Sequence, residues 1–218
     1  MLKYRPFEMH CHTRHSDGTF LVPQLIESVA AYGYAGLALT DHNAVTGLLE
    51  VTEELQRKNN CLVLPGIEWT TFYGHLLVIG CDRFVDWRFV TPDTIDEALQ
   101  EIRAAGGIAG VAHPCEVGSP LMCGCNWEFR VKRWDLMDYV EIWSGPDPHA
   151  SAKNGLAMPW YDALLNQGYH LAISAGRDWH GPDKPGQIPL LTATYLGIDG
   201  DVTIENAKAA IRAGRTYV

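Results

Sequence analysis

Residues that could bind a metal recur at one kind of position in this sequence, at or just after the end of a predicted β-strand. His10 and His12 are two residues apart, so on a strand their imidazoles lie on the same face. Asp178 and His180 repeat that spacing near the other end of the chain. Imidazoles that converge with carboxylates suit Mn, Fe or Zn, and the pattern does not choose among these metals. The complete set is His10, His12, Asp17, Asp41, His42, Glu68, His75, His113, Asp178 and His180.

A single histidine near a strand end is more often a hydrogen-bonded structural residue than a ligand, and we assign His149 and His170 to that class. His15 fits a substrate contact and a surface position equally well. Chance is a weak explanation for the set as a whole, because six of the nine histidines fall at strand ends beside a carboxylate or a turn residue. We therefore expect these residues to form one site.

The hydrophobic pattern predicts strands that alternate with helices over the whole chain. The predicted helices are Val22–Tyr32, Thr46–Lys58, Asp93–Ala105, Met158–Gln167 and Ile204–Ala213. In the third helix, Thr94 followed by Glu97 predicts a capping box. The predicted strands are Tyr4–Cys11, Gly36–Thr40, Cys61–Trp69, His75–Gly80, Ile108–Ala112, Tyr139–Trp143, His170–Ser174 and Thr192–Leu196.

This alternation implies parallel βαβ units, in which the carboxyl ends of the strands meet on one face. About seven such repeats favour a closed or distorted βα barrel over a small open sheet. We expect an α/β fold with one domain over residues 1–218 and the metal-binding residues at the barrel mouth. Loops that border this mouth are expected at Glu116–Trp134, Pro146–Asn154 and Gly181–Gly186.

The composition limits the classes of partner. A net charge of −9 over 218 residues argues against broad nucleic-acid binding, which depends on clustered Lys and Arg. A small anionic substrate stays compatible, because metals reverse the field inside a pocket. The sequence has neither a membrane-spanning apolar run nor an apolar signal-peptide core, so we expect a cytoplasmic protein without membrane contact. The six cysteines, with Cys123 and Cys125 as the close pair, fit small buried hydrophobes better than disulfides or a zinc site.

Several motifs together resemble the PHP family, the polymerase and histidinol phosphatase superfamily of metal-dependent phosphoesterases. They are His10-Cys11-His12 running to Asp17-Gly18, Thr40-Asp41-His42-Asn43, Gly66-Ile67-Glu68-Trp69, Gly74-His75, Ala112-His113-Pro114 and Asp178-Trp179-His180. The CehA/McbA branch in particular is resembled by Glu68-Trp69-Thr70-Thr71, Val140-Glu141-Ile142-Trp143 and the C-terminal Ala213–Val218. The chain lacks the insertion of family members that act on nucleotides or short oligonucleotides.

The resemblance implies a distorted (β/α)7 barrel that holds two to three divalent metals, up to a trinuclear centre. The first metal would be bound by His10, His12, Glu68 and Asp178. Glu68 would bridge to a second metal that His75 and His113 complete. The third metal would be bound by Asp17, His42 and His180. Asp41 would orient a ligand or a water.

The expected reaction is hydrolysis of a phosphate mono- or diester of a small molecule by a hydroxide held between two metals beside Glu68. Arg177 is expected to bind the phosphate bidentately, with Arg14 as a second candidate, and the alternative for Arg177 is a surface salt bridge. The expected catalytic set is thus Glu68, Asp178, Arg177 and Asp41.

Two other functions stay open. The same metals could hydrolyse a non-phosphate ester, carbamate or amide. A non-catalytic PHP module that binds a partner is the other alternative, and the complete ligand set argues against it. The oligomeric state is left open by the sequence.

Overall fold

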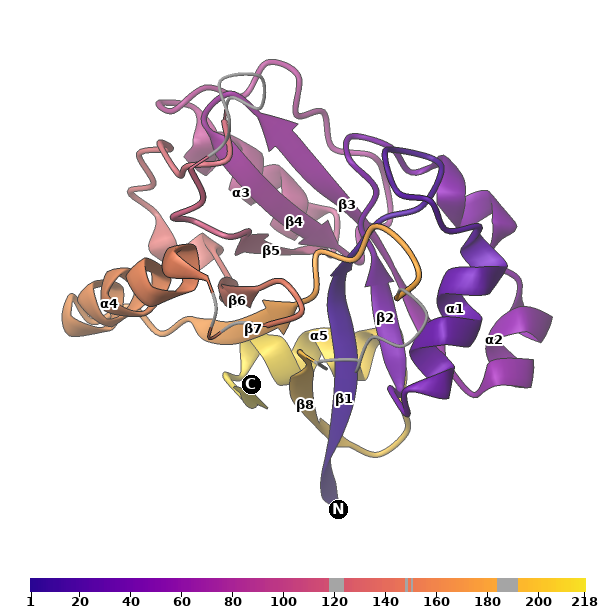
Figure 1. Ribbon diagram of the computed structural model, residues 1–218. Coiled ribbons are helices and arrows are strands. Elements are labelled where there is room, and N and C mark those ends of the chain that lie inside the picture. Colours follow the sequence, from indigo (N-terminus) through magenta and orange to yellow (C-terminus); the bar gives the residue numbers. More distant parts are fainter. Residues whose placement is uncertain (118–123, 148, 150, 184–191) are drawn as a thin grey trace.

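The computed structural model describes residues 1–117, 124–147, 149, 151–183 and 192–218, and one twisted sheet dominates it (Figure 1). Along this sheet the strands follow the order β7-β6-β5-β4-β3-β2-β1-β8-β9. Their bounds are β1 Leu2–Cys11, β2 Gly36–Leu39, β3 Leu62–Thr71, β4 Gly74–Ile79, β5 Ile108–Val111, β6 Tyr139–Ser144, β7 Ala172–Gly176, β8 Thr194–Asp199 and β9 Thr216–Tyr217.

The helices of the described residues lie around this sheet, with α1 and α2 beside β1 and β2 (Figure 1). Helix α4 begins at Ala152, six residues before the predicted start, although Pro159 lies inside it. The predicted helix at 46–58 is divided into a 3₁₀ turn, Thr46–Glu50, and α2. The α-helices are α1 Val22–Ala31, α2 Glu53–Asn59, α3 Ile95–Ala104, α4 Ala152–Asn166 and α5 Ile204–Arg212.

The prediction of parallel strand–helix repeats is wrong for strands β4 and β8, which run antiparallel to the strands they pair with. Strands β3 and β4 form an antiparallel hairpin with the two-residue turn Phe72-Tyr73, so no helix lies between them. Strand β8 runs antiparallel to β1. Hydrophobic periodicity reports which faces of a strand are buried, but it carries no information on strand direction.

The capping box predicted for α3 is also wrong. The Thr94 hydroxyl makes no cap to the helix and instead accepts a hydrogen bond from the backbone N–H of Thr91. The loop predicted at Pro146–Asn154 extends too far, because Asn154 belongs to α4.

The sheet is nearly closed where the segment after β7 meets the end of β1. The backbone N–H of Trp179 donates to the His10 carbonyl at 3.1 Å, and the Trp179 carbonyl accepts from the backbone N–H of His12 at 2.9 Å. Gly176 allows this approach, since a Cβ there would lie 2.4 Å from Cβ of His10. The Glu8 carboxylate spans the same seam by accepting from the N–H groups of His10 and Arg177. The expected distorted α/β barrel is therefore confirmed, without a regular sevenfold strand–helix repeat.

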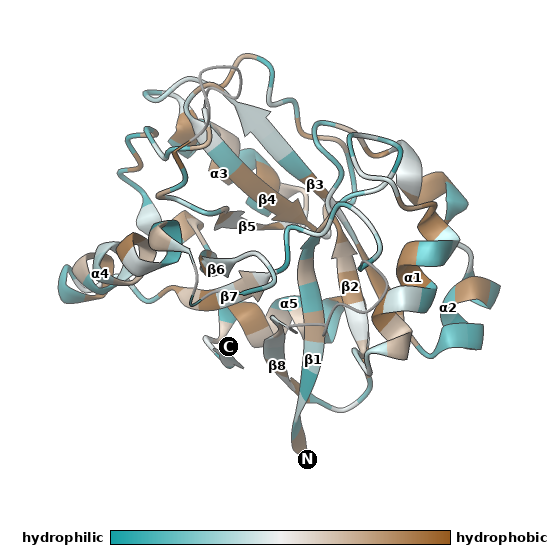
Figure 2. Ribbon diagram, in the orientation of Figure 1, coloured by the Kyte–Doolittle hydropathy of each residue, from teal (hydrophilic) through white to brown (hydrophobic). Residues whose placement is uncertain are grey.

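A hydrophobic core fills the barrel below its mouth. On β4, Leu77 and Ile79 share a face with His75 by strand alternation, and they pack in one cluster with Tyr139 and with Ile211 of α5. Figure 2 shows hydrophobic residues along most of β4, as expected of a strand buried on both faces. This packed floor gives the residues at the mouth a rigid support. Among the described residues, no helix is long and apolar enough to cross a bilayer.

Candidate metal centre

The structure brings all nine residues of the expected ligand set to the barrel mouth. His10 lies at the end of strand β1 and His12 directly after it, Asp17 lies in the following loop, and His42 follows β2. His75 starts β4 instead of ending it, and the antiparallel direction of β4 puts its first residues at the mouth. The nitrogen and oxygen atoms of the nine residues form several groups that share members, and within each group the atoms lie within 4.8 Å of one another. Together these groups contain His10, His12, Asp17, His42, Glu68, His75, His113, Asp178 and His180.

The Glu68 carboxylate, fully buried, lies at the centre of the cluster. Its Oε1 is 2.9 Å from Nδ1 of His75 and 3.2 Å from Nε2 of His113. Its Oε2 is 2.9 Å from Nδ1 of His42 and 3.1 Å from Nε2 of His10. One carboxylate thus faces imidazoles from four different segments through both oxygens, an arrangement that could bridge two ions.

These spacings fit divalent metals. Two ligands at about 2.1 Å from one ion lie roughly 3.0 Å apart at an octahedral edge and roughly 3.4 Å apart at a tetrahedral edge. Among the described residues, several buried ligand atoms also have no hydrogen-bond partner, and burying a polar atom unpaired is costly. They include Nδ1 of His12 and Nε2 of His75. The donor set and its unpaired atoms therefore fit a metal centre of nitrogen and oxygen ligands.

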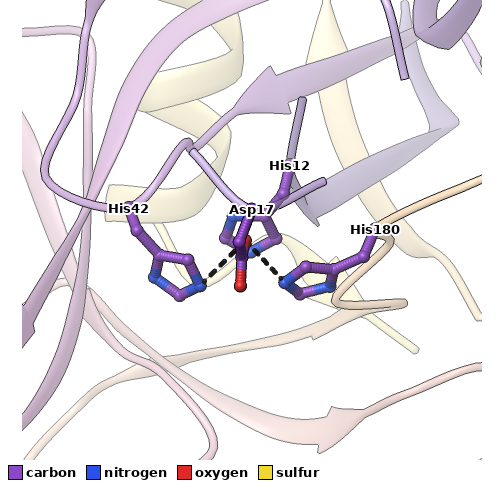
Figure 3. A group of neighbouring side chains, drawn as sticks. All are labelled: His12, Asp17, His42 and His180. Carbon is purple, nitrogen blue, oxygen red and sulfur yellow. Dashed lines mark ion pairs between the residues drawn. The ribbon is translucent and has the colours of Figure 1, made fainter. Parts of the chain in front are cut away.

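A second part of the cluster, drawn in Figure 3, consists of His12, Asp17, His42 and His180. Oδ1 of Asp17 is 3.2 Å from Nε2 of His180 and 3.6 Å from Nε2 of His42. The His12 ring is stacked on the rings of both histidines, with centroids 4.2 Å from His42 and 4.1 Å from His180. The Asp17 side chain is 58% exposed, whereas Glu68 is buried, so the cluster has an open outer part and a closed inner part.

Two residues of the cluster have strained backbones. His113 has φ 25° and Asp178 has φ 50°, in the left-handed region that non-glycine residues seldom adopt. Such conformations cost of order 1–3 kcal/mol each and persist where surrounding structure holds them. Both lie immediately beyond strands that enter the mouth, so the strain aims their side chains into the cluster.

The charges of the cluster couple its protonation states. Burial opposes ionisation of Glu68, but His10, His113 and His42 hold the pKa of its carboxyl well below the usual range. Burial also disfavours the imidazolium of His10, and Glu141 and Glu68 nevertheless raise its pKa well above the usual value. Burial lowers the pKa of His12. Neutral His12 and ionised Glu68 are the forms that bind metal.

Glu141 is a functional residue that the sequence reasoning did not assign. It is fully buried in β6, and its Oε1 lies 3.0 Å from Nδ1 of His10. Its other oxygen accepts from the N–H of His113 at 2.9 Å. A carboxylate behind a ligand histidine fixes its ring orientation and tautomer. The sequence feature that could have identified Glu141 is its position near the end of a predicted strand, two residues before Trp143.

Asp41 is turned toward the backbone of the first loop. Its oxygens accept from the N–H and hydroxyl of Thr13, both at 2.7 Å, and from the hydroxyl of Ser16 at 2.8 Å. It lies outside the ligand groups of the described residues. Asp41 therefore holds the loop that carries Asp17, which is a positioning role.

Arg177 does not reach the cluster. Its guanidinium is paired with both oxygens of Asp183 and lies over the Trp179 ring, 4.0 Å from the centroid. The residue is buried, and Asp183 accepts from both of its terminal nitrogens, whereas Nε has no hydrogen-bond partner among the described residues. The guanidinium thus makes a buried salt bridge with Asp183, and the expected phosphate contact stays a prediction. Arg14 is exposed and donates from Nε to the carbonyl of Thr19.

The remaining histidines lie outside the ligand groups of the described residues. His15 contacts Thr46 and Glu50, at 2.9 and 2.8 Å. His149 and His170 are exposed. Cys125 is buried, whereas Cys123 lies outside the described residues.

A carboxylate that the sequence reasoning did not single out borders the inner cluster. Oε2 of Glu116 is 3.7 Å from Nδ1 of His113, and Glu116 can group with His113 and Asp178 around an ion. Lys153 of α4 places Nζ 2.6 Å from the same oxygen. The two residues are 37 positions apart, in segments expected to be loops, so no local pattern connects them.

The comparisons with known sequences agree with this site. A family model described as the PHP domain matches residues 8–108, a stretch that carries His10 to His75 of the ligand set. Over 79 residues the chain is 34% identical to a 3',5'-nucleoside bisphosphate phosphatase of Chromobacterium violaceum. This match covers 34% of the chain and 27% of that relative, so the chain spans about a quarter of the relative's length.

Two solved structures share the fold. One is a two-domain protein from Bacteroides vulgatus that contains a predicted PHP-like metal-dependent phosphoesterase, with a TM-score of 0.72 and 17% identity. The likeness covers 99% of this chain and 64% of that chain. The other is an amidohydrolase from Chromobacterium violaceum with bound sulfate and no metal, with a TM-score of 0.55, 19% identity and coverage of 85% and 90%. The barrel is therefore PHP-like in fold.

Proposed function

We propose that this chain is a metal-dependent phosphoesterase that hydrolyses a phosphate mono- or diester of a small molecule. The observation that carries the proposal is the buried Glu68 carboxylate, which faces imidazoles from four segments through both oxygens. The PHP-domain match over residues 8–108 and the phosphatase relative support the same class of reaction. The motifs also favour the CehA/McbA branch of the family.

The proposed metals are two to three ions of Mn, Fe or Zn, which suit imidazole and carboxylate donors. His10, His12, Glu68 and Asp178 would hold the first ion. Glu68, His75 and His113 would hold the second. Asp17, His42 and His180, drawn together in Figure 3, would hold the third. The outer group is the more exposed, so its ion should exchange most readily.

When bound, such ions lower the pKa of a water and offset the charge of phosphoryl oxygens. The protein's own contribution is preorganisation. Glu141 fixes His10, Asp41 fixes the loop of Asp17, and the packed floor below His75 keeps the ligands from shifting. Asp178 lies beside His10 and His12 at 3.4 and 3.1 Å, so its charge completes the inner part of the site.

A test compares substrate classes with the metal-reconstituted protein. The panel contains phosphomonoesters, phosphodiesters, carboxyl esters, a carbamate and an amide. We expect turnover of a phosphate ester that requires added metal and disappears in Glu68→Gln. Turnover confined to carboxyl esters, the carbamate or the amide would replace this proposal with a non-phosphate hydrolase. A protein that holds metals and turns over nothing in the panel would favour a partner-binding module.

A further inference from the structure

Lys153 lies beside the inner metal ligands without being one of them. Its Nζ is 2.6 Å from Oε2 of Glu116, and that oxygen is 3.7 Å from Nδ1 of His113. The Lys153 side chain is only 21% exposed. A single carboxylate therefore separates its ammonium group from the ligand His113.

The start of α4 holds Lys153 in this place. Asn154 accepts from the N–H of Ser144 at 3.0 Å and donates to the Ser144 carbonyl at 3.1 Å. These two bonds fasten the first turn of α4 to the end of β6, where β6 enters the mouth. Lys153 thus projects from a helix that is fixed to the barrel.

The ammonium group has donor capacity beyond its protein contacts. Lysine carries three N–H donors. Among the described residues, Lys153 contacts Oε2 of Glu116 and, at 3.4 Å, Oγ of Ser144. One donor is therefore available for an anion at the mouth.

The arginines expected to bind phosphate are engaged elsewhere. Arg177 is buried against Asp183 and Trp179, and Nε of Arg14 is bonded to the Thr19 carbonyl in the exposed first loop. A phosphate ester carries negative charge that a positioned cation stabilises. Lys153 is a cation that the structure holds beside the inner ligands.

We infer that Lys153 binds a phosphoryl oxygen of the substrate, with Glu116 as the positioning residue that holds the ammonium group at the mouth. The inference rests on the proposed phosphoesterase function, since it assigns the phosphate subsite of that same centre. Glu116 would otherwise repel an anion, and its pairing with Lys153 also removes that repulsion.

Binding of inorganic phosphate tests this assignment without requiring turnover. Calorimetric titrations with orthophosphate are made on Mn²⁺-reconstituted wild type, Lys153→Met, the double variant Glu116→Gln/Lys153→Met, and Lys58→Met. The last is a matched control, because exposed Lys58 of α2 is also paired with a glutamate, Glu27, at 3.5 Å. Metal content and the thermal unfolding midpoint are measured for each.

Lys153→Met should bind orthophosphate about ten- to a hundredfold more weakly, which is the range for a hydrogen bond to a charged group, and should keep its metals. The double variant should stay weak, because the direct contact is still missing, and Lys58→Met should match the wild type. The inference is overturned if Lys153→Met binds like the wild type or loses metal. Restoration of affinity in the double variant overturns it too, since the effect would then be the unpaired charge of Glu116. Wild-type protein that holds metals but binds no orthophosphate also overturns it. Weak binding by Lys153→Met in a protein that hydrolyses no phosphate ester would leave the subsite standing and the proposed reaction wrong.

Discussion

Nδ1 of His10 lies 3.0 Å from Oε1 of Glu141, so a buried carboxylate of β6 stands behind an imidazole of β1. The second oxygen of Glu141 accepts from the N–H of His113 at 2.9 Å. One side chain thus orients two residues of the inner cluster that belong to different strands. The metal site is therefore supported by a contact across the barrel and not by its ligands alone.

Glu141→Gln should weaken metal binding. A glutamine side chain has one acceptor end and one donor end, so either His10 or the N–H of His113 loses its acceptor. Loss of such an orienting partner typically costs 10–100-fold in metal affinity, and about that range is expected here. Competition with a chromophoric chelator measures the affinity. Glu101→Gln, on the exposed side of α3, is the control, and equal affinities in the two variants would exclude the orienting role.

Glu68→Gln should lose activity far more than it loses fold. The amide has no charge to hold two cations, so we expect at least about a hundredfold loss of kcat on a phosphate ester. We also expect fewer bound ions, because the carboxylate faces ligands of more than one metal. Circular dichroism should remain that of the wild type. Wild-type turnover by this variant would show that the bridge lies elsewhere.

Arg177→Ala should destabilise the protein without impairing phosphate binding. The change leaves the carboxylate of Asp183, 15% exposed, without its arginine partner, and removes the cation from the Trp179 ring. Breaking a buried pair of this kind costs about 3 kcal/mol of unfolding free energy. Urea unfolding measures that loss, and kcat/KM on a phosphate ester should change little.

The matched control for Arg177→Ala is Arg88→Ala. Arg88 makes a similar two-pronged contact with Asp86, but it does so at the surface. Its removal should leave the urea midpoint nearly unchanged, since exposed pairs contribute little. A large fall in kcat/KM for Arg177→Ala at unchanged stability would return Arg177 to the substrate site.

The sequence was sufficient to predict that the nine candidate ligands lie together, because residue type and position at a strand end are both local features. His10, His12 and Asp178 could be placed at the mouth from alternation and strand order alone. His75 was placed correctly for a different reason than expected, because β4 runs antiparallel and presents its start. Strand direction depends on the pairing of distant segments, which periodicity does not encode.

The contacts around the ligands could not be predicted in the same way. The direction of Arg177 depends on the end of β7 at Gly176 and on the left-handed backbone of Asp178, and an extended strand end was assumed instead. No local sequence pattern identified Asp183 as the partner of Arg177. Lys153, which meets Glu116, lies in the part of α4 that precedes the predicted start at Met158. These features are set by tertiary packing rather than by local propensity.

Glu8 makes the stability of the metal-free protein depend on pH. Burial raises the pKa of its carboxyl to about 8, although the backbone N–H groups of His10 and Arg177 favour the charged form. In the unfolded chain the pKa of a glutamate is about 4.3. Between these values the folded state holds a proton that the unfolded state has released, so the free energy of unfolding falls as pH rises through this window.

Glu8→Gln should remove this part of the pH dependence. Relative to the wild type, the metal-free variant should gain about 1.4 kcal/mol of stability per pH unit between roughly pH 5 and pH 8. Urea unfolding at several pH values checks the slope, with Glu101→Gln as the exposed control. Parallel curves for Glu8→Gln and the wild type would show that Glu8 does not retain a proton on folding.

The dependence of phosphate-ester hydrolysis on metal equivalents shows whether the clustered side chains form a catalytic metal centre. Protein stripped by a chelator is titrated with Mn²⁺, Fe²⁺ or Zn²⁺, and the rate is followed together with bound metal. We expect no hydrolysis in the stripped protein. The rate should rise to its maximum at two to three bound ions per chain, which is the capacity proposed for the nine clustered ligands. Full hydrolysis by the stripped protein, or none at any metal content, would contradict this expectation.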